Sequence, residues 1–122
     1  AYIPPAPLRL VDAEFGSGFD RQTMQVAPAL RELAPGQGIS IWGLTAIRAP
    51  LGLRDKVQHR WYRNGRLLWA SPFYEMTGGR EEGFRIWTVY AFNSIEPGMA
   101  LRVDLRTEGG QLIGRAEIKA RR

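Results

Sequence analysis

Cysteine is missing from the 122 residues, and histidine occurs once, as His59. The missing thiols exclude disulfides, thiolate metal sites and a cysteine nucleophile, although they leave the compartment open. A metal site built on histidines is disfavoured because a second imidazole is lacking. We therefore expect no metal and no cofactor.

Long apolar runs are missing as well, and none approaches the ~20 residues that a membrane-spanning helix needs. The chain also lacks a positively charged start followed by an apolar stretch, the mark of a signal peptide. With 44% hydrophobic and 24% charged residues, it is typical of a globular domain with one core. Such a domain can stand alone or form the soluble part of a larger protein.

Lysine is scarce, because only Lys56 and Lys119 are lysines among the 17 basic residues. The net charge of +5 favours partners such as nucleic acid, phospholipid headgroups or acidic polysaccharide. The basic residues are nevertheless mixed with acidic ones, and only residues 60–66 and 121–122 are locally dense. Scattered, solvated charge is therefore the preferred interpretation, because no block of like charge stands out.

Glycine and proline divide the chain into short segments with β-type patterns. Residues 1–7 are Pro-rich and predict an extended lead-in, and residues 8–122 predict a single domain. Residues 19–38 predict irregular chain with at most a turn of helix, because Pro28 interrupts their apolar spacing. About seven short strands separated by turns favour an all-β fold, an antiparallel β-sandwich with an immunoglobulin-like layout. The strand candidates are 8–14, 39–48, 57–63, 66–71, 73–76, 84–92, 101–107 and 111–119.

The stretch HRWYRNGRLLW predicts a β-hairpin in the middle of the chain. Its turn is Asn64-Gly65, because this dipeptide favours the positive φ angles of a two-residue turn. In the resulting register Trp61 faces Leu68 and Arg60 faces Trp69, and residues that face each other share one side of the sheet.

The two sides of this hairpin have different predicted roles. His59 and Trp61 are expected to face the core, where His59 is a structural histidine. Arg60, Tyr62 and Trp69 lie on the opposite side and are candidate ligand-binding residues, with Arg60 stacked on Trp69 as a cation–π pair. The alternative is that arginine merely covers tryptophan on an ordinary sheet surface.

A second hairpin is predicted near the end of the chain, with Gly109-Gly110 as its turn. This register places Asp104 opposite Arg115 and Arg102 opposite Glu117. Opposite charges that face each other stabilise a sheet, so the register is favoured.

The segment GGREEGFR at residues 78–85 predicts a loop with candidate ligand-binding residues. Arg80 and Arg85 can clamp a carboxylate or a phosphate in bidentate fashion. The lysine and helix of a phosphate-binding loop are missing. The alternative is that these arginines are held internally by Glu81, Glu82 or a backbone carbonyl.

Catalytic equipment is sparse, and we expect no enzyme. A general base at His59 would need a carboxylate or a nucleophile nearby, and none is local in the sequence. The alternative from another functional class is a small glutamate-dependent hydrolase that uses Glu75 or Glu81 with His59.

Two resemblances add to these patterns. WYRNGRLL resembles the third strand of immunoglobulin-like domains, where a tryptophan packs in the core, although the disulfide cysteines of those domains are absent here. HRW, GGREEGFRIW and PGMALRVDLRTEGGQLIG resemble an uncharacterised family of bacterial domains of unknown function that often lie C-terminal to multi-span membrane proteins. The resemblance covers residues 39–119 and implies a β fold in a periplasmic or envelope-associated location, while the residues themselves leave a cytoplasmic one open. The matching positions are His59, Trp61, Gly65, Gly79, Arg80, Gly83, Arg85, Trp87, Gly98, Val103, Gly110 and Gly114.

These observations favour a non-catalytic, soluble binding module of the bacterial cell envelope, attached to a membrane protein. The expected partner is another protein, or an anionic or carbohydrate envelope component, and contact with the membrane runs only through a fused or partner segment. A carbohydrate-binding module is the alternative, and nucleic-acid binding ranks lower because no basic stripe is clustered.

Overall fold

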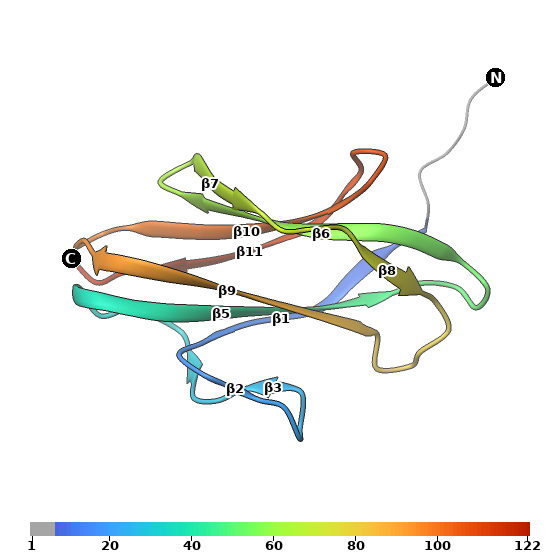
Figure 1. The fold of residues 1–122 in the computed structure, drawn as a ribbon, viewed down its shortest axis with the longest axis horizontal. Coiled ribbons are helices and arrows are strands. Elements are labelled where there is room, and N and C mark those ends of the chain that lie inside the picture. Colours follow the sequence, from blue (N-terminus) through green and yellow to red (C-terminus); the bar gives the residue numbers. More distant parts are fainter. Residues whose placement is uncertain (1–6) are drawn as a thin grey trace.

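Two antiparallel sheets lie face to face in the computed structural model, which describes residues 7–122 (Figure 1). The first sheet has the order β4-β1-β5-β9, with the bounds Ala29–Leu30, Arg9–Gly16, Gly36–Arg48 and Phe84–Ile95. The second has the order β11-β10-β6-β7, with the bounds Leu112–Lys119, Ala100–Thr107, Arg54–Arg63 and Arg66–Ala70. β8 (Tyr74–Thr77) also pairs with β6, and β2 (Phe19–Asp20) pairs with β3 (Gln25–Val26).

This architecture confirms the all-β, antiparallel fold that the sequence predicts. The order β1-β5-β9 against β11-β10-β6 agrees with the immunoglobulin-like layout, in which strands A, B and E face strands G, F and C. The predicted lead-in at residues 1–7 lies outside the described residues, apart from Pro7. In the described part of the chain, no helix could cross a membrane.

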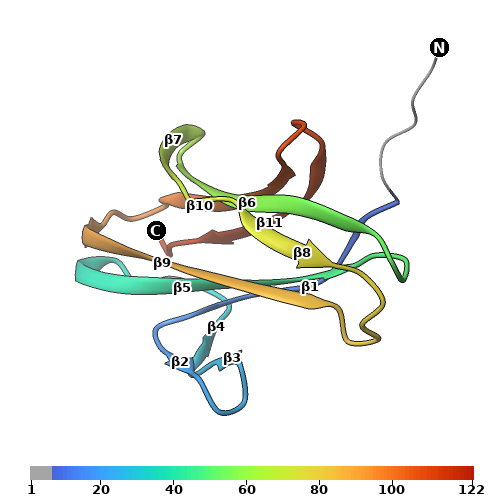
Figure 2. The ribbon, with the colours of Figure 1, turned by 45° about the vertical axis from the view of Figure 1, so that its right-hand side comes forward.

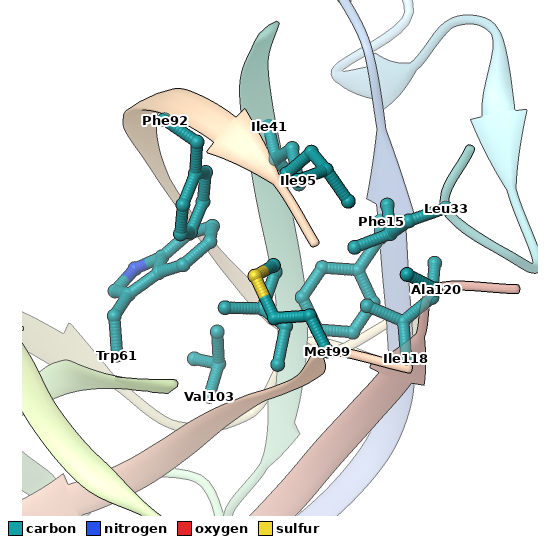
Figure 3. Packing of buried hydrophobic residues seen from close by; sticks show 11 residues of the cluster. Phe15, Leu33, Ile41, Trp61, Phe92, Ile95, Met99, Val103, Ile118 and Ala120 are labelled. Atoms are coloured by element: carbon teal, nitrogen blue, oxygen red, sulfur yellow. The ribbon is translucent and has the colours of Figure 1, made fainter. Parts of the chain in front are cut away.

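The core lies between the sheets because alternate residues of each long strand point inward. Fully buried Trp61 of β6 contacts Phe15 of β1 edge to face, with ring centroids 6.2 Å apart. Figure 3 shows the cluster that contains this ring, to which both sheets contribute. A second buried cluster fills the other end of the sandwich and contains Ile47, Ala49, Val57, Met76, Ile86 and Leu105.

The sheets meet along one side of the sandwich and separate along the other. On the closed side, a Cβ at Gly114 of β11 would lie 2.7 Å from a methyl carbon of Leu10 of β1, so only glycine allows this approach. Leu33 and Ala120 form a further bridge on that side. On the open side, a cleft of about 630 Å³ lies between β8 and β9.

The prediction for residues 19–38 is wrong, because they hold three short strands and the start of β5, and no helix. The β2–β3 hairpin lies on the outer side of the first sheet (Figures 1 and 2). There Phe19 stacks between Trp42 and Trp87, with ring centroids 5.3 and 4.9 Å away. These contacts form only once β5 and β9 are paired, so no local pattern reveals them.

The predicted turn of the central hairpin is confirmed. Asn64 and Gly65 have φ angles of 50° and 82°, as a two-residue turn of this type requires. Arg63 faces Arg66, as predicted. The burial of His59 and Trp61 is confirmed as well.

Tyr62 also faces Leu67, but the predicted register is wrong from Trp61 onward, and so is the pairing of Arg60 with Trp69. The register shifts between Tyr62 and Trp61, which leaves Leu68 of β7 as an extra residue in a β-bulge. Arg60 therefore faces Ala70, and Trp69 faces Trp61. Leu68 packs against the core, and Trp69 stays 36% exposed.

The predicted register of the closing hairpin is confirmed in its charged pairs. Asp104 faces Arg115 and Arg102 faces Glu117. Closer to the turn, a bulge between Leu105 and Arg106 shifts the register by one residue, so that Arg106 faces Leu112. β10 also pairs with β6, so the charged side of this hairpin continues onto the central hairpin.

Candidate functional site

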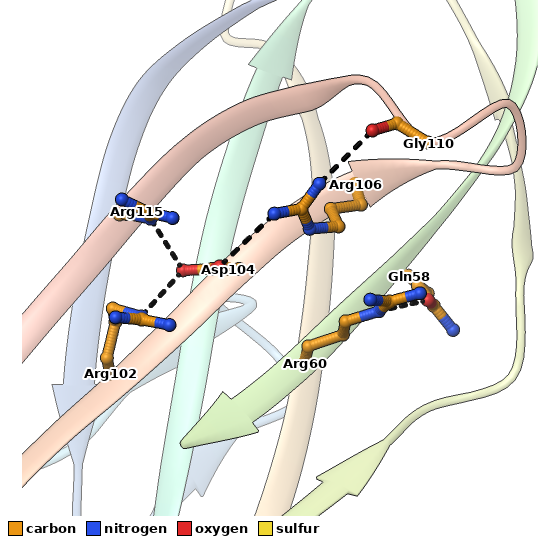
Figure 4. Close-up of polar contacts among 7 residues, drawn as sticks. All are labelled: Gln58, Arg60, Arg102, Asp104, Arg106, Gly110 and Arg115. Carbon is orange, nitrogen blue, oxygen red and sulfur yellow. Dashed lines mark hydrogen bonds and ion pairs between the residues drawn. The ribbon is translucent and has the colours of Figure 1, made fainter. Parts of the chain in front are cut away.

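The outer side of the second sheet carries three rows of side chains that run across β6, β10 and β11. The middle row is Arg60, Asp104 and Arg115, and the flanking rows are Tyr62, Arg102 and Glu117 on one side and Gln58, Arg106 and Leu112 on the other. Figure 4 shows the guanidinium groups gathered around Asp104. We call Arg60, Tyr62, Arg102, Asp104, Arg106 and Arg115 the arginine face.

Asp104 lies at the centre of the arginine face, and its side chain is completely buried. Arg115 Nε donates a hydrogen bond to Asp104 Oδ1 over 3.1 Å. Arg102 Nε lies 3.0 Å from the same oxygen but is not aligned as a hydrogen bond. Arg106 Nη2 lies 3.9 Å from Oδ2, which accepts no hydrogen bond from the described residues. Three guanidinium groups therefore share one carboxylate.

Positive charge is in excess on this face. Four arginines lie beside two carboxylates, Asp104 and the exposed Glu117, so the net charge of the three rows is +2. Arg60 has no carboxylate partner within residues 7–122, and its Nε donates to the amide oxygen of Gln58 over 2.8 Å. The guanidinium of Arg102 lies over the ring of Tyr62, 4.2 Å from its centroid, as a cation–π pair.

Replacing Asp104 with asparagine should lower the free energy of unfolding by about 1–3 kcal/mol, because a buried, charged hydrogen-bond acceptor is lost. Urea denaturation measures this loss. Glu117→Gln is the matched control, since it removes the same charge from an exposed neighbour and should change stability by less than about 0.5 kcal/mol. Equal losses in the two variants would contradict a central role for Asp104.

The structure divides the five candidate residues predicted from the sequence between different places. Arg60 and Tyr62 lie together on the arginine face, next to four residues that the sequence had not singled out as ligand contacts. Trp69 lies on β7 opposite Trp61 and away from Arg60 in the register. Arg80 and Arg85 lie on or beside β9, in the other sheet.

The remaining two candidates lie near the open side of the sandwich. The guanidinium of Arg80 lies 5.4 Å from the ring centroid of Phe84. Arg85 Nη1 donates to the backbone carbonyls of Thr23 and Met24 over 3.4 and 3.3 Å. Arg85 is thus held by backbone carbonyls, which the sequence offered as the alternative to ligand binding, and it ties the β2–β3 hairpin to β9.

The cleft on the open side is rich in aromatic side chains. Its lining consists of Phe73, Tyr74, Glu75, Phe84, Arg85, Ile86 and Trp87. Tyr74 and Glu75 belong to β8, and Phe84 to Trp87 belong to β9. An aromatic cleft that also carries one carboxylate, on Glu75, and one guanidinium group, on Arg85, is suited to a small polar molecule with an apolar face.

His59 belongs to a buried polar network and not to a surface site. Its Nε2 and Nδ1 lie 2.7 Å from Thr45 Oγ1 and 2.6 Å from Thr88 Oγ1. Trp61 Nε1 donates to the same Thr88 hydroxyl over 2.8 Å. Burial lowers the pKa of His59 from 6.5 to about 3. Because both ring nitrogens face threonine hydroxyls, the pairing with Glu75 or Glu81 that the hydrolase alternative needs is not formed.

Comparison of the sequence with the models of known protein families and with curated proteins gives no match. Across residues 7–122, no three histidine, aspartate or glutamate side chains gather as a metal site would need.

Proposed function

We propose that this chain is a non-catalytic binding module that holds an anionic ligand on the arginine face. The observation that carries the proposal is the sharing of Asp104 by three arginines, with Arg60 beside them and free of any carboxylate partner in the described chain. Planar guanidinium groups donate pairs of hydrogen bonds that match the oxygens of carboxylates and phosphates. The face therefore offers both charge and directed donors.

The ligand class follows from this chemistry. A phosphate or carboxylate group carried by an envelope component suits the excess charge, and the ring of Tyr62 offers an apolar surface beside it. The bacterial envelope setting, with attachment to a membrane protein, rests on the resemblance of residues 39–119 to bacterial domains of unknown function that often lie C-terminal to multi-span membrane proteins. Ligand binding by the remaining candidates, Trp69, Arg80 and Arg85, is a separate proposal, because they lie away from this face.

Titration of the chain with polyphosphate and with polygalacturonate tests the proposal and separates the two anionic groups. The double variant Arg60→Gln/Arg102→Gln should weaken binding of the better probe by about tenfold or more, because each charged hydrogen bond contributes about 1.5–3 kcal/mol. Affinity should also fall as salt is raised from 50 to 200 mM, as electrostatic binding requires.

The matched control is the double variant Arg9→Gln/Arg21→Gln, which removes the same charge from two exposed arginines, one on β1 and one in the β2–β3 turn, outside the arginine face. We expect its affinity to stay within about twofold of the native value, since charges beyond a Debye length of ~10 Å are largely screened. Equal weakening by both double variants, or no binding to either probe, would overturn the proposal.

A second candidate function is the binding of a neutral carbohydrate in the aromatic cleft, which the exposed ring of Phe73 beside Glu75 favours. Maltoheptaose is a suitable uncharged probe for the same titration. Binding that is lost in Phe73→Ala and unaffected by Arg60→Gln/Arg102→Gln would favour the cleft over the arginine face.

A further inference from the structure

β9 is an edge strand whose outer edge has no partner strand in the described chain. It is 12 residues long and hydrogen-bonded to β5 along one side. Its sequence, FRIWTVYAFNSI, contains no proline, glycine or lysine and only one charge, on Arg85. The guanidinium of Arg85 is turned toward the carbonyls of Thr23 and Met24. The devices that usually keep an edge strand from pairing are therefore missing here.

The other strand edges of the sandwich are covered, short or irregular. β4 borders part of β1, and β11 lies against β1 through the close approach of Gly114 to Leu10. β8 has only four residues, and β7 is interrupted by the bulge at Leu68. Among the described strands, β9 is thus the only one that has a long free edge and no register shift.

The outer side of β9 carries an apolar stripe. Val89 is 40% exposed, Trp87 stays 37% exposed although Phe19 stacks on its ring, and Ala91 continues the stripe at the next alternate position. Arg85 and Asn93 lie at the two ends of this stripe. An extended segment that added to β9 would satisfy the free backbone groups and cover these side chains at the same time.

The stripe is complementary to itself. When a second β9 is placed antiparallel with Val89 opposite Val89, the large ring of Trp87 faces the small Ala91, and Arg85 faces Asn93. Each pair then combines compatible sizes, and no like charges face each other. A two-fold axis through Val89 would make these contacts twice, as an isologous dimer interface requires.

We propose that a second copy of this chain pairs with β9 in antiparallel orientation, centred on Val89. The two first sheets then form one continuous sheet, and the arginine faces stay free on the outer layers. This dimer does not depend on the proposed anion binding, because the interface lies in the other sheet.

Light scattering after size-exclusion chromatography tests the dimer directly. The native chain should have twice its 13.8 kDa mass at micromolar concentrations. Val89→Lys should be monomeric, because the two-fold axis would bring two lysines together and lysine protects edge strands. Val11→Lys is the matched control, because Val11 is 37% exposed on β1, which β5 separates from β9. This variant should remain a dimer.

Single cysteines give a second readout that does not need a destabilising change, since the native chain contains no cysteine. Val89→Cys should form a disulfide-linked dimer under mild oxidation, because facing Cβ atoms of an antiparallel pair lie about 4.5–5.5 Å apart. Ala91→Cys should not, because the two copies of residue 91 would lie four residues apart along the strands.

A native chain that stays monomeric up to millimolar concentration would overturn the proposal and leave the edge to a strand from another protein. A dimer that persists in Val89→Lys, or that crosslinks equally through Val11→Cys and Val89→Cys, would also overturn it. Anion binding is unaffected by any of these outcomes, so the two proposals fail separately.

Discussion

Replacing Trp61 with alanine should lower the free energy of unfolding by about 3–5 kcal/mol, the usual cost of removing a large aromatic side chain from a core. Domains of this kind have a free energy of unfolding of about 5–15 kcal/mol, so the variant should be only marginally folded. Trp61 is completely buried and belongs to the larger core cluster.

The size of this effect follows from three kinds of contact. The ring packs edge to face on Phe15 and stacks with Tyr90, both at 6.2 Å between centroids. Its Nε1 donates to the hydroxyl of Thr88, which would keep only His59 as a partner after the substitution. Gly43 of the facing sheet leaves room for the ring, because a Cβ there would lie 3.1 Å from Trp61 Cζ2.

Trp69→Ala is the matched control, because Trp69 faces Trp61 across the same hairpin and is 36% exposed. Urea denaturation of both variants should show a loss of about 1 kcal/mol or less for Trp69→Ala. Similar losses in the two variants would mean that Trp69 also supports the core, against its exposure in the structure.

The contrast between these two tryptophans shows what the sequence could and could not predict. The Asn64-Gly65 turn and the burial of Trp61 follow from local chemistry and alternation, and both are confirmed. The bulge at Leu68 does not follow from either, because an extra residue changes the register without changing the apolar pattern. The predicted pair of Arg60 and Trp69 depended on that register and was therefore wrong.

The arginine face was predictable in part. The sequence RVDLR alternates charged and apolar residues, which places Arg102, Asp104 and Arg106 on one side of β10. The pairing of Asp104 with Arg115 was predicted from the closing hairpin and is confirmed. The position of Arg60 in the same row was not predictable, because the contact between β10 and β6 joins segments about 40 residues apart without a shared turn.

Acidification from pH 6.5 to pH 4.5 should lower the free energy of unfolding by about 2.5 kcal/mol through His59. Burial lowers the pKa of His59 from 6.5 to about 3 in the folded chain, so the unfolded chain binds one more proton between these values. Stability then rises with pH in this window, at about 1.4 kcal/mol per pH unit, and falls as the pH is lowered toward 3. The window ends at pH 4.5 because carboxylates, whose usual pKa is about 4, titrate below it.

Urea denaturation at several pH values measures this slope, and His59→Gln is the variant that isolates it. Glutamine keeps hydrogen-bonding groups near Thr45 and Thr88 but carries no titrating proton, so its stability should be nearly constant from pH 6.5 to 4.5. Its stability at pH 7 should be lower than that of the native chain, because the amide cannot reproduce both short contacts of the ring. An equally steep slope in His59→Gln would assign the acid sensitivity to other groups, and a flat slope in the native chain would mean that His59 can be protonated without leaving the core.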